Sequence, residues 1–124
     1  MKTNVELIST RVYAGRLKDR ENLNNSSSGG AFTALSDFFL KNGNAVVAAI
    51  YNYENHTTEF QMILDKDQRE RAKGSKYMQS KPGGIFREAY RWLMDNSGKK
   101  MLFVGMGCQS DGFRKFSEIK EIRD

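Results

Sequence analysis

The sequence predicts an α/β fold: a single small domain with a mixed sheet of about four strands and three main helices. Segments with the apolar spacing of helices alternate along the chain with short apolar runs of strand length, which is typical of this fold class. The length of 124 residues suffices for one hydrophobic core but is short for two domains of ordinary size. We therefore expect residues 1–124 to form one domain.

Four segments are predicted to form strands. Residues 11–17 alternate apolar with small or charged residues, as in a strand with one covered face. Residues 44–53 carry an apolar run without alternation, which is typical of a central strand covered on both faces. Residues 57–65 alternate with a period of two and should pair with that strand as an antiparallel hairpin. Residues 100–105 are predicted to add a short buried strand.

Apolar residues at helical spacing predict the helices. One runs from about residue 28 to 42, and residues 66–73 form a short one. Pro82 fits the first position of another helix, which should stop at Ser97. The last predicted helix is amphipathic, and its apolar residues are Phe113, Phe116, Ile119 and Ile122.

The composition limits the classes of function. The net charge of +5 admits an anionic partner, but 20 basic against 15 acidic residues do not require nucleic acid. The basic run between Asp65 and Lys81 could attract phosphates or be an ordinary solvated face, and it lacks the interleaved aromatic rings of a nucleic-acid surface. No apolar run reaches membrane-spanning length and no signal peptide is evident, so we expect a cytoplasmic protein.

The sequence gives little indication of a metal site or of a serine or cysteine nucleophile with its base. One cysteine and one histidine exclude an internal disulfide and a zinc-finger-type metal site. The glycine patterns of Rossmann and P-loop phosphate sites are absent. His56 lies in a polar turn and reads as a surface residue, so no catalytic base for a serine or cysteine suggests itself.

A loop of serines and glycines, residues 24–30, leads directly into the first long predicted helix. Its serines offer capping oxygens, its glycines allow close backbone approach, and the amides of the following helical turn can face an anion. A phosphate or carboxylate site is one interpretation. The alternative is that Ser28 only caps the helix and the glycines only turn the chain.

Two further glycine-bearing loops, residues 74–80 and 105–109, stand before other predicted helices. Ligands of α/β sheets gather at the carboxyl ends of strands, where such loops cluster. If the three loops converge, they form one pocket of backbone amides and serine hydroxyls, together with Lys76, Tyr77 and Cys108.

Cys108 follows a predicted buried strand and precedes a predicted helix. Amide dipoles at such a position can lower the pKa of a thiol, which would suit a nucleophile or a metal ligand. The alternative is a small buried thiol that only packs.

Four segments stand in a characteristic order and spacing: Val12-Tyr13-Ala14, Ser26-Ser27-Ser28-Gly29-Gly30-Ala31-Phe32-Thr33, Gly74-Ser75-Lys76-Tyr77-Met78-Gln79-Ser80 and Phe103-Val104-Gly105-Met106-Gly107-Cys108-Gln109. Through these segments the chain resembles, over roughly residues 11–120, the N-terminal domain of the coenzyme F420 hydrogenase/dehydrogenase beta-subunit family. Members are flavin- and iron-sulfur-containing oxidoreductase subunits, and related chains occur among bacterial polysaccharide-biosynthesis proteins.

The resemblance implies a flavin-nucleotide site, for FAD, at the first two loops, with Lys76 favouring the negative charge of the cofactor. Cys108 stands at the cysteine of the family's Gly-x-Pro-Cys-Gln motif, which implies a catalytic redox role or cluster ligation, although Gly107 replaces the proline. The residues implied to bind the cofactor are Ser27, Ser28, Gly29, Gly30, Gly74, Ser75, Lys76, Tyr77 and Gln109.

Full-length members also carry a ferredoxin-like cysteine set and a C-terminal domain, which this chain lacks. A cluster with four cysteine ligands cannot be held by one cysteine, so a partner would have to supply the ligands. Our first hypothesis is a flavin-site domain that is incomplete as an enzyme and works with a redox partner subunit or the missing C-terminal domain. The alternatives are a non-catalytic module that forms a homo-oligomer through the last helix, and a nucleotide- or sugar-phosphate-binding domain.

Overall fold

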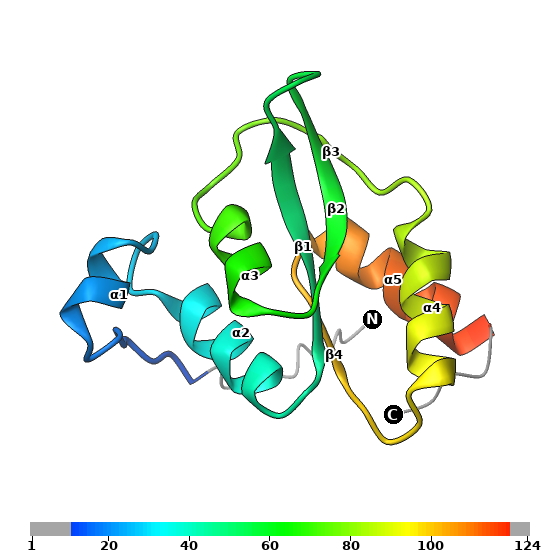
Figure 1. Cartoon of the computed structure of the whole chain (residues 1–124), viewed down its shortest axis with the longest axis horizontal. Helices are drawn as coiled ribbons and strands as arrows, with labels where there is room; N and C mark the ends of the chain where they lie inside the picture. Colours follow the sequence, from blue (N-terminus) through cyan, green and yellow to red (C-terminus); the bar gives the residue numbers. More distant parts are fainter. Residues whose placement is uncertain (1–10, 120–124) are drawn as a thin grey trace, which may run out of the picture.

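A four-stranded sheet is covered by helices on both faces, which gives three layers (Figure 1). This computed structural model describes residues 11–119. Helices α2 (Ala31–Lys41) and α3 (Lys66–Ala72) cover one face, and α4 (Ile85–Asp95) and α5 (Gly107–Ile119) cover the other. The predicted α/β fold with about four strands and three main helices is confirmed, since α2, α4 and α5 are the long helices of the described part.

The sheet is mixed and has the strand order β3-β2-β1-β4. Strand β1 (Ala45–Asn52) pairs antiparallel with β2 (Thr57–Ile63) and parallel with β4 (Met101–Phe103). The two-residue strand β3 (Ser80–Lys81) runs parallel to β2. The predicted hairpin and the central position of its first strand are therefore confirmed.

Alternate side chains of β1 enter two separate cores. Val46, Ala48 and Ile50 pack toward α2 and α3, whereas Val47 packs with Ile85 of α4 and other residues on the opposite face. Burial on both faces explains why the sequence of β1 shows no polar alternation. Complete burial of each valine or isoleucine is worth roughly 1.5–3 kcal/mol, so this strand anchors both helical layers.

Helix α2 ends close to its predicted end but begins at Ala31, later than the predicted start at about residue 28. Gly30 is the residue before the first helical position, and Gly43, with φ 68°, follows the end of the helix. A positive φ after the last turn is the usual place for glycine, because a Cβ atom is disfavoured there. The chain then turns directly into β1.

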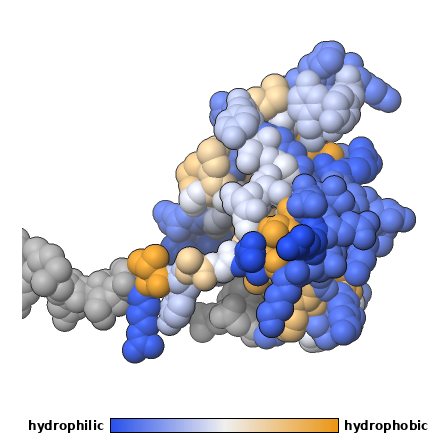
Figure 2. All heavy atoms as spheres, turned by 90° about the vertical axis from the view of Figure 1, so that its left-hand side faces the viewer, coloured by the Kyte–Doolittle hydropathy of each residue, from blue (hydrophilic) through white to orange (hydrophobic). Residues whose placement is uncertain are grey.

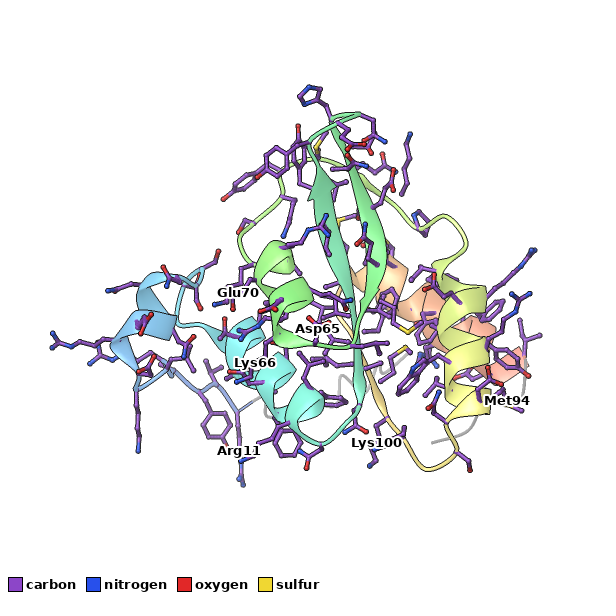
Figure 3. All side chains as sticks on the ribbon, viewed as in Figure 1. Arg11, Asp65, Lys66, Glu70, Met94 and Lys100 are labelled. Carbon is purple, nitrogen blue, oxygen red and sulfur yellow. The ribbon has the colours of Figure 1, made fainter. Side chains whose placement is uncertain are left out.

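A buried arginine joins α2 to α3. The Arg69 guanidinium lies 2.8 Å from a carboxylate oxygen of Asp37 on α2 and 3.2 Å from Glu70. Only 3% of the Arg69 side chain is exposed, against 32% for Asp37. Lys66 and Glu70 flank this contact from α3 (Figure 3). A buried cation is tolerated here because two carboxylates accompany it.

Two expectations about local structure are wrong. Residues 11–17 form no strand, because no strand of the described part lies beside them. The amide of Leu17 donates instead to the carbonyl of Gly29 in a loop. A short helix, α1 (Arg20–Asn24), follows them. Pro82 does not begin a helix, since Ser80–Lys81 pairs with β2 and α4 starts only at Ile85.

The last helix does not offer the free apolar seam that we expected for self-association. The ring of Phe113 packs on Phe103, and the ring of Phe116 lies 5.9 Å from Phe86 and 6.3 Å from Tyr90. Of the other predicted seam residues, Ile119 is exposed and Ile122 lies outside the described residues. Figure 2 presents a different side of the molecule, the side on which α1 lies in Figure 1, and there apolar residues are scattered among hydrophilic ones.

We predict that Asp37→Asn lowers the free energy of unfolding by about 1–3 kcal/mol, because it removes one of the two carboxylates that compensate the buried Arg69 charge. Arg69→Met should cost less, since it removes the charge itself and leaves the partly exposed Asp37 to water. Urea unfolding of both variants measures this order. A neutral Asp37→Asn beside a strongly destabilising Arg69→Met would contradict it.

Candidate functional site

Two adjoining hollows open where β1 and β4 approach their carboxyl ends. The smaller one has a volume of about 240 Å³ and lies between the start of α2, strand β1 and the loop after α3. Ala48, Ala49 and Val104 contribute its sheet side. The two loops contribute Ser26, Ser27, Gly30, Gly74, Ser75 and Lys76.

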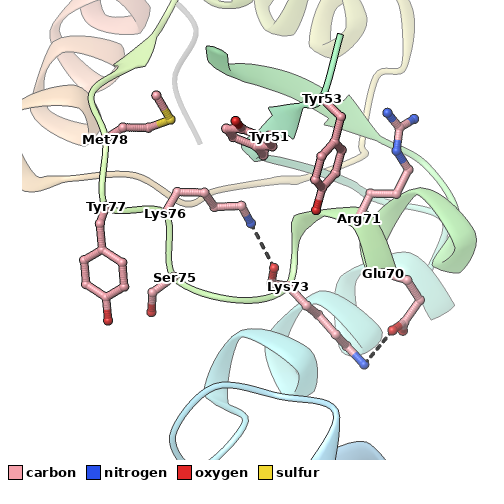
Figure 4. A pocket seen from close by; sticks show the side chains of 9 residues that line it. All are labelled: Tyr51, Tyr53, Glu70, Arg71, Lys73, Ser75, Lys76, Tyr77 and Met78. Carbon is pink, nitrogen blue, oxygen red and sulfur yellow. Dashed lines mark hydrogen bonds and ion pairs between the residues drawn. The ribbon is translucent and has the colours of Figure 1, made fainter. Parts of the chain in front are cut away.

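The larger hollow is an open groove of about 820 Å³ (Figure 4). One wall holds Tyr51 and Tyr53 at the end of β1, and the other holds Glu70, Arg71 and Lys73 at the end of α3. Residues 75–78 complete it. Lys73, Ser75 and Lys76 line both hollows, so the groove and the smaller hollow lie side by side.

The N-terminus of α2 borders the smaller hollow without a side-chain cap. Gly30, with φ 78°, precedes the helix, and no side chain accepts from its first amides. The expected serine cap is therefore wrong: Ser28 lies outside the helix with φ 54°, and the hydroxyl of Ser26 bonds to Asn22 and Thr33 instead. Uncapped first-turn amides carry partial positive charge and can accept an anion.

The glycines before α2 make room for the chain's own backbone. A Cβ atom on Gly29 would collide with the carbonyl oxygen of Gly15, and one on Gly30 would collide with the side chain of Leu17. The amide of Leu17 donates to the carbonyl of Gly29 at 2.9 Å. The absence of a side chain at Gly29 thus allows residues 15–17 to pack against it. Neither Ser28 nor Gly29 lines either of the two hollows.

Lys76 is committed to the end of α3. Its ammonium group donates to the carbonyl oxygens of Ala72, Lys73 and Gly74, the last two at 3.0 Å. A cation favours the carbonyl end of a helix. Partial burial lowers the pKa of Lys76 below the ordinary lysine value. Lys76 therefore fixes the loop that separates the two hollows, and its three donors already have acceptors.

Arg71 carries the charge that faces the larger groove. The ammonium of Lys73 lies 2.8 Å from a carboxylate oxygen of Glu70, a carboxylate that Lys73 shares with Arg69, so Lys73 is already engaged in an ion pair (Figure 4). Arg71 is exposed and forms no ion pair with any other described residue. The groove thus combines one available cation with exposed aromatic rings.

Three tyrosines line that groove. The rings of Tyr51 and Tyr53 meet edge to face with centroids 4.8 Å apart, and Tyr53 is 81% exposed. Tyr77 is 98% exposed. Exposed tyrosine rings offer flat apolar faces to a planar ligand. No sequence motif marks Tyr51 or Tyr53, and Arg71 stands out only as part of the basic run between Asp65 and Lys81. The signal for the two tyrosines is their place at the end of the central strand.

The third predicted loop does not join the other two. Cys108 lies in the first turn of α5, is exposed, and lines neither hollow. The alternative of a buried thiol that only packs is therefore wrong. Gln109 accepts from the amide of Met106 at 2.9 Å and donates to the hydroxyl of Ser80 at 3.0 Å. Residues 11–119 contain no cluster of histidine, cysteine and carboxylate groups that could hold a metal ion.

The uncapped N-terminus of α2 and the glycine-bearing loops lie near the carboxyl ends of the strands, where ligands of α/β domains commonly bind. Comparison with protein-family models names the family: the model of the coenzyme F420 hydrogenase/dehydrogenase beta subunit, N-terminal part, matches residues 12–83. The chain belongs to this family, and the resemblance seen in its sequence is confirmed.

A solved structure supports the fold. The chain superposes with a TM-score of 0.68 and 24% sequence identity on a chain described as "Xenon derivatization of the F420-reducing [NiFe] hydrogenase complex from Methanosarcina barkeri". The match covers 86% of this chain and 36% of that one, so the protein described here spans about a third of its relative's length. No curated protein matches the chain. None of the helices described is both long and apolar enough to cross a bilayer.

We predict that Gly29→Ala releases residues 15–17 from the loop before α2, because the added methyl group collides with backbone atoms that cannot rotate away. The change should raise amide hydrogen exchange at Leu17 and lower stability by about 1–3 kcal/mol. Gly107→Ala is the matched control, since a Cβ atom there meets nothing within 4 Å. Unchanged exchange at Leu17 in Gly29→Ala would contradict this role of the glycine.

Proposed function

We propose that this chain is the flavin-nucleotide-binding domain of an oxidoreductase of the beta-subunit kind. The observation that carries the proposal is the convergence of the serine-glycine loop and the loop after α3 at the uncapped start of α2, beside a groove of tyrosines. Family membership supports the same chemistry, because the family is named for redox subunits.

The residues present fit a flavin nucleotide. The first-turn amides of α2, with Ser27 and Ser75 beside them, suit the diphosphate of FAD, and Arg71 adds a positive charge nearby. The faces of Tyr53 and Tyr77 suit a planar ring system. When bound, a flavin would supply hydride and single-electron transfer, for which the described side chains offer no substitute.

We further propose that the domain works together with a partner. One cysteine cannot hold a four-cysteine cluster, so iron-sulfur electron transfer would need ligands from a redox subunit or a C-terminal domain. The solved relative is described as part of a complex, which agrees with this arrangement. Cys108 lies outside both hollows, so in this proposal a redox role for it depends on a partner that approaches α5.

A second candidate is a nucleotide- or sugar-phosphate-binding domain without flavin. It is favoured by the smaller hollow, whose α2 amides and serines suit a phosphate whatever is attached to it. Separate titrations with FAD, riboflavin and ADP distinguish the two. Binding of FAD and of riboflavin supports the flavin site, whereas competition by ADP without any riboflavin binding favours the second candidate.

We predict that binding changes the fluorescence of FAD. Arg71→Glu should weaken the affinity for FAD by about tenfold or more, because it replaces the positive charge of the groove that adjoins the diphosphate site by a negative one. Arg87→Glu on α4 is the control: it makes the same change of net charge at an exposed site that lines neither hollow. Equal loss of affinity in both variants would show a general charge effect and contradict the assignment of the site. Failure of the unaltered protein to bind FAD would overturn the proposed function.

A further inference from the structure

The turn that joins β1 to β2 holds the single histidine of the chain in a strained conformation. Asn52 accepts from the amide of Glu54 at 2.9 Å, and Asn55 accepts from the amide of Thr57 at 3.2 Å and from its hydroxyl at 2.6 Å. Between these bonds His56 adopts φ 53°, in the left-handed region that few residues other than glycine occupy. These hydrogen bonds therefore stabilise a turn in which the backbone of His56 is strained.

This conformation brings the imidazole to a residue of the groove. Nδ1 of His56 lies 2.9 Å from the hydroxyl of Tyr51, and the two ring centroids are 6.3 Å apart. Tyr51 lines the larger groove between Met78 and Tyr53 (Figure 4). His56 lines neither hollow, so its influence on a ligand in the groove passes through Tyr51.

We propose that His56 is a positioning residue that sets the direction in which the Tyr51 hydroxyl donates its hydrogen, and thereby tunes the affinity of the groove for a planar ligand rich in acceptors. This inference rests on the proposed function, in which that ligand is the flavin ring. The only chemical change that this role requires is the uptake of one proton from solvent by the imidazole of His56.

The two protonation states of the imidazole require opposite hydrogen bonds. Neutral His56 with its hydrogen on Nε2 accepts from the Tyr51 hydroxyl through Nδ1. A protonated imidazole has a hydrogen on both nitrogens and can only donate. The Tyr51 oxygen must then accept from Nδ1, and its own hydrogen becomes free to donate to a ligand in the groove. Protonation of His56 should therefore strengthen the binding of a ligand that offers acceptors.

Other ionisable groups lie near the imidazole and the groove, and a test has to separate their effect from that of His56. The charged residues of the hairpin and of the opposite wall of the groove are Glu54, Glu59, Glu70, Arg71, Lys73 and Lys76.

The test is a titration with FAD between about pH 5.5 and pH 8, a range in which its diphosphate does not titrate. The unaltered protein should bind FAD about three to ten times more tightly at the lower pH, the gain of one hydrogen bond. His56→Asn, which tolerates the left-handed conformation, and Tyr51→Phe should each remove this dependence. Glu54→Gln, which removes another titratable group of the same turn, should retain it.

Two results would overturn the proposal. One is a pH dependence of FAD affinity that survives in Tyr51→Phe, which would come from the imidazolium charge alone. The other is a pH dependence that survives in His56→Asn.

Nitrogen NMR of the imidazole tests the role of His56 without any ligand. Neutral His56 should carry its hydrogen on Nε2, and Tyr51→Phe should weaken that preference. A neutral form with its hydrogen on Nδ1 would overturn the proposal. Absence of FAD binding overturns the proposed function, and the NMR result still decides the role of His56.

Discussion

The burial of β1 on both faces is the constraint on which the rest of the structure depends. Its alternate residues enter two cores, so each helical layer is held against the same strand. Both neighbours of β1 are fixed by its ladders, β2 antiparallel and β4 parallel. Because α2 leads into β1 through a tight turn, the start of α2 comes to lie beside the later residues of the strand. The two hollows open at that place.

Contacts within the chain also determine which groups of the candidate site are available to a ligand. Small residues before α2 admit the chain's own segment 15–17 on one side and leave the helix N-terminus uncapped on the other. Lys76 holds the loop after α3 against the carbonyl end of that helix, which leaves Arg71 as the cation that faces the groove. Some of the charges and glycines that the sequence offers to a ligand thus make internal contacts that hold the loops in place, and the others line the hollows.

Prediction from sequence worked where local pattern and tertiary environment agree. The hairpin, the central strand and α2 can be recognised from the sequence, because the faces that each element buries determine the spacing of its apolar residues. Residues 11–17 carry the alternation of a strand but have no strand beside them among the described residues, and pairing cannot be seen in a single segment. The loops at residues 24–30 and 74–80 were placed together correctly, whereas the loop at Cys108 enters α5 on the other face of the sheet.

The sequence by itself determined the fold class, the family and the chemical character of the loops, because periodicity, length and the succession of motifs are properties of the chain. Only the tertiary structure decided which polar groups are free. Lys76, Ser26 and Gly29 are occupied by internal contacts, whereas Tyr53 and Arg71, which belong to no sequence motif of the site, face an open groove. The physical reason is that a donor, a charge or a bare glycine serves whichever group lies nearest in space, and that neighbour comes from a distant part of the chain.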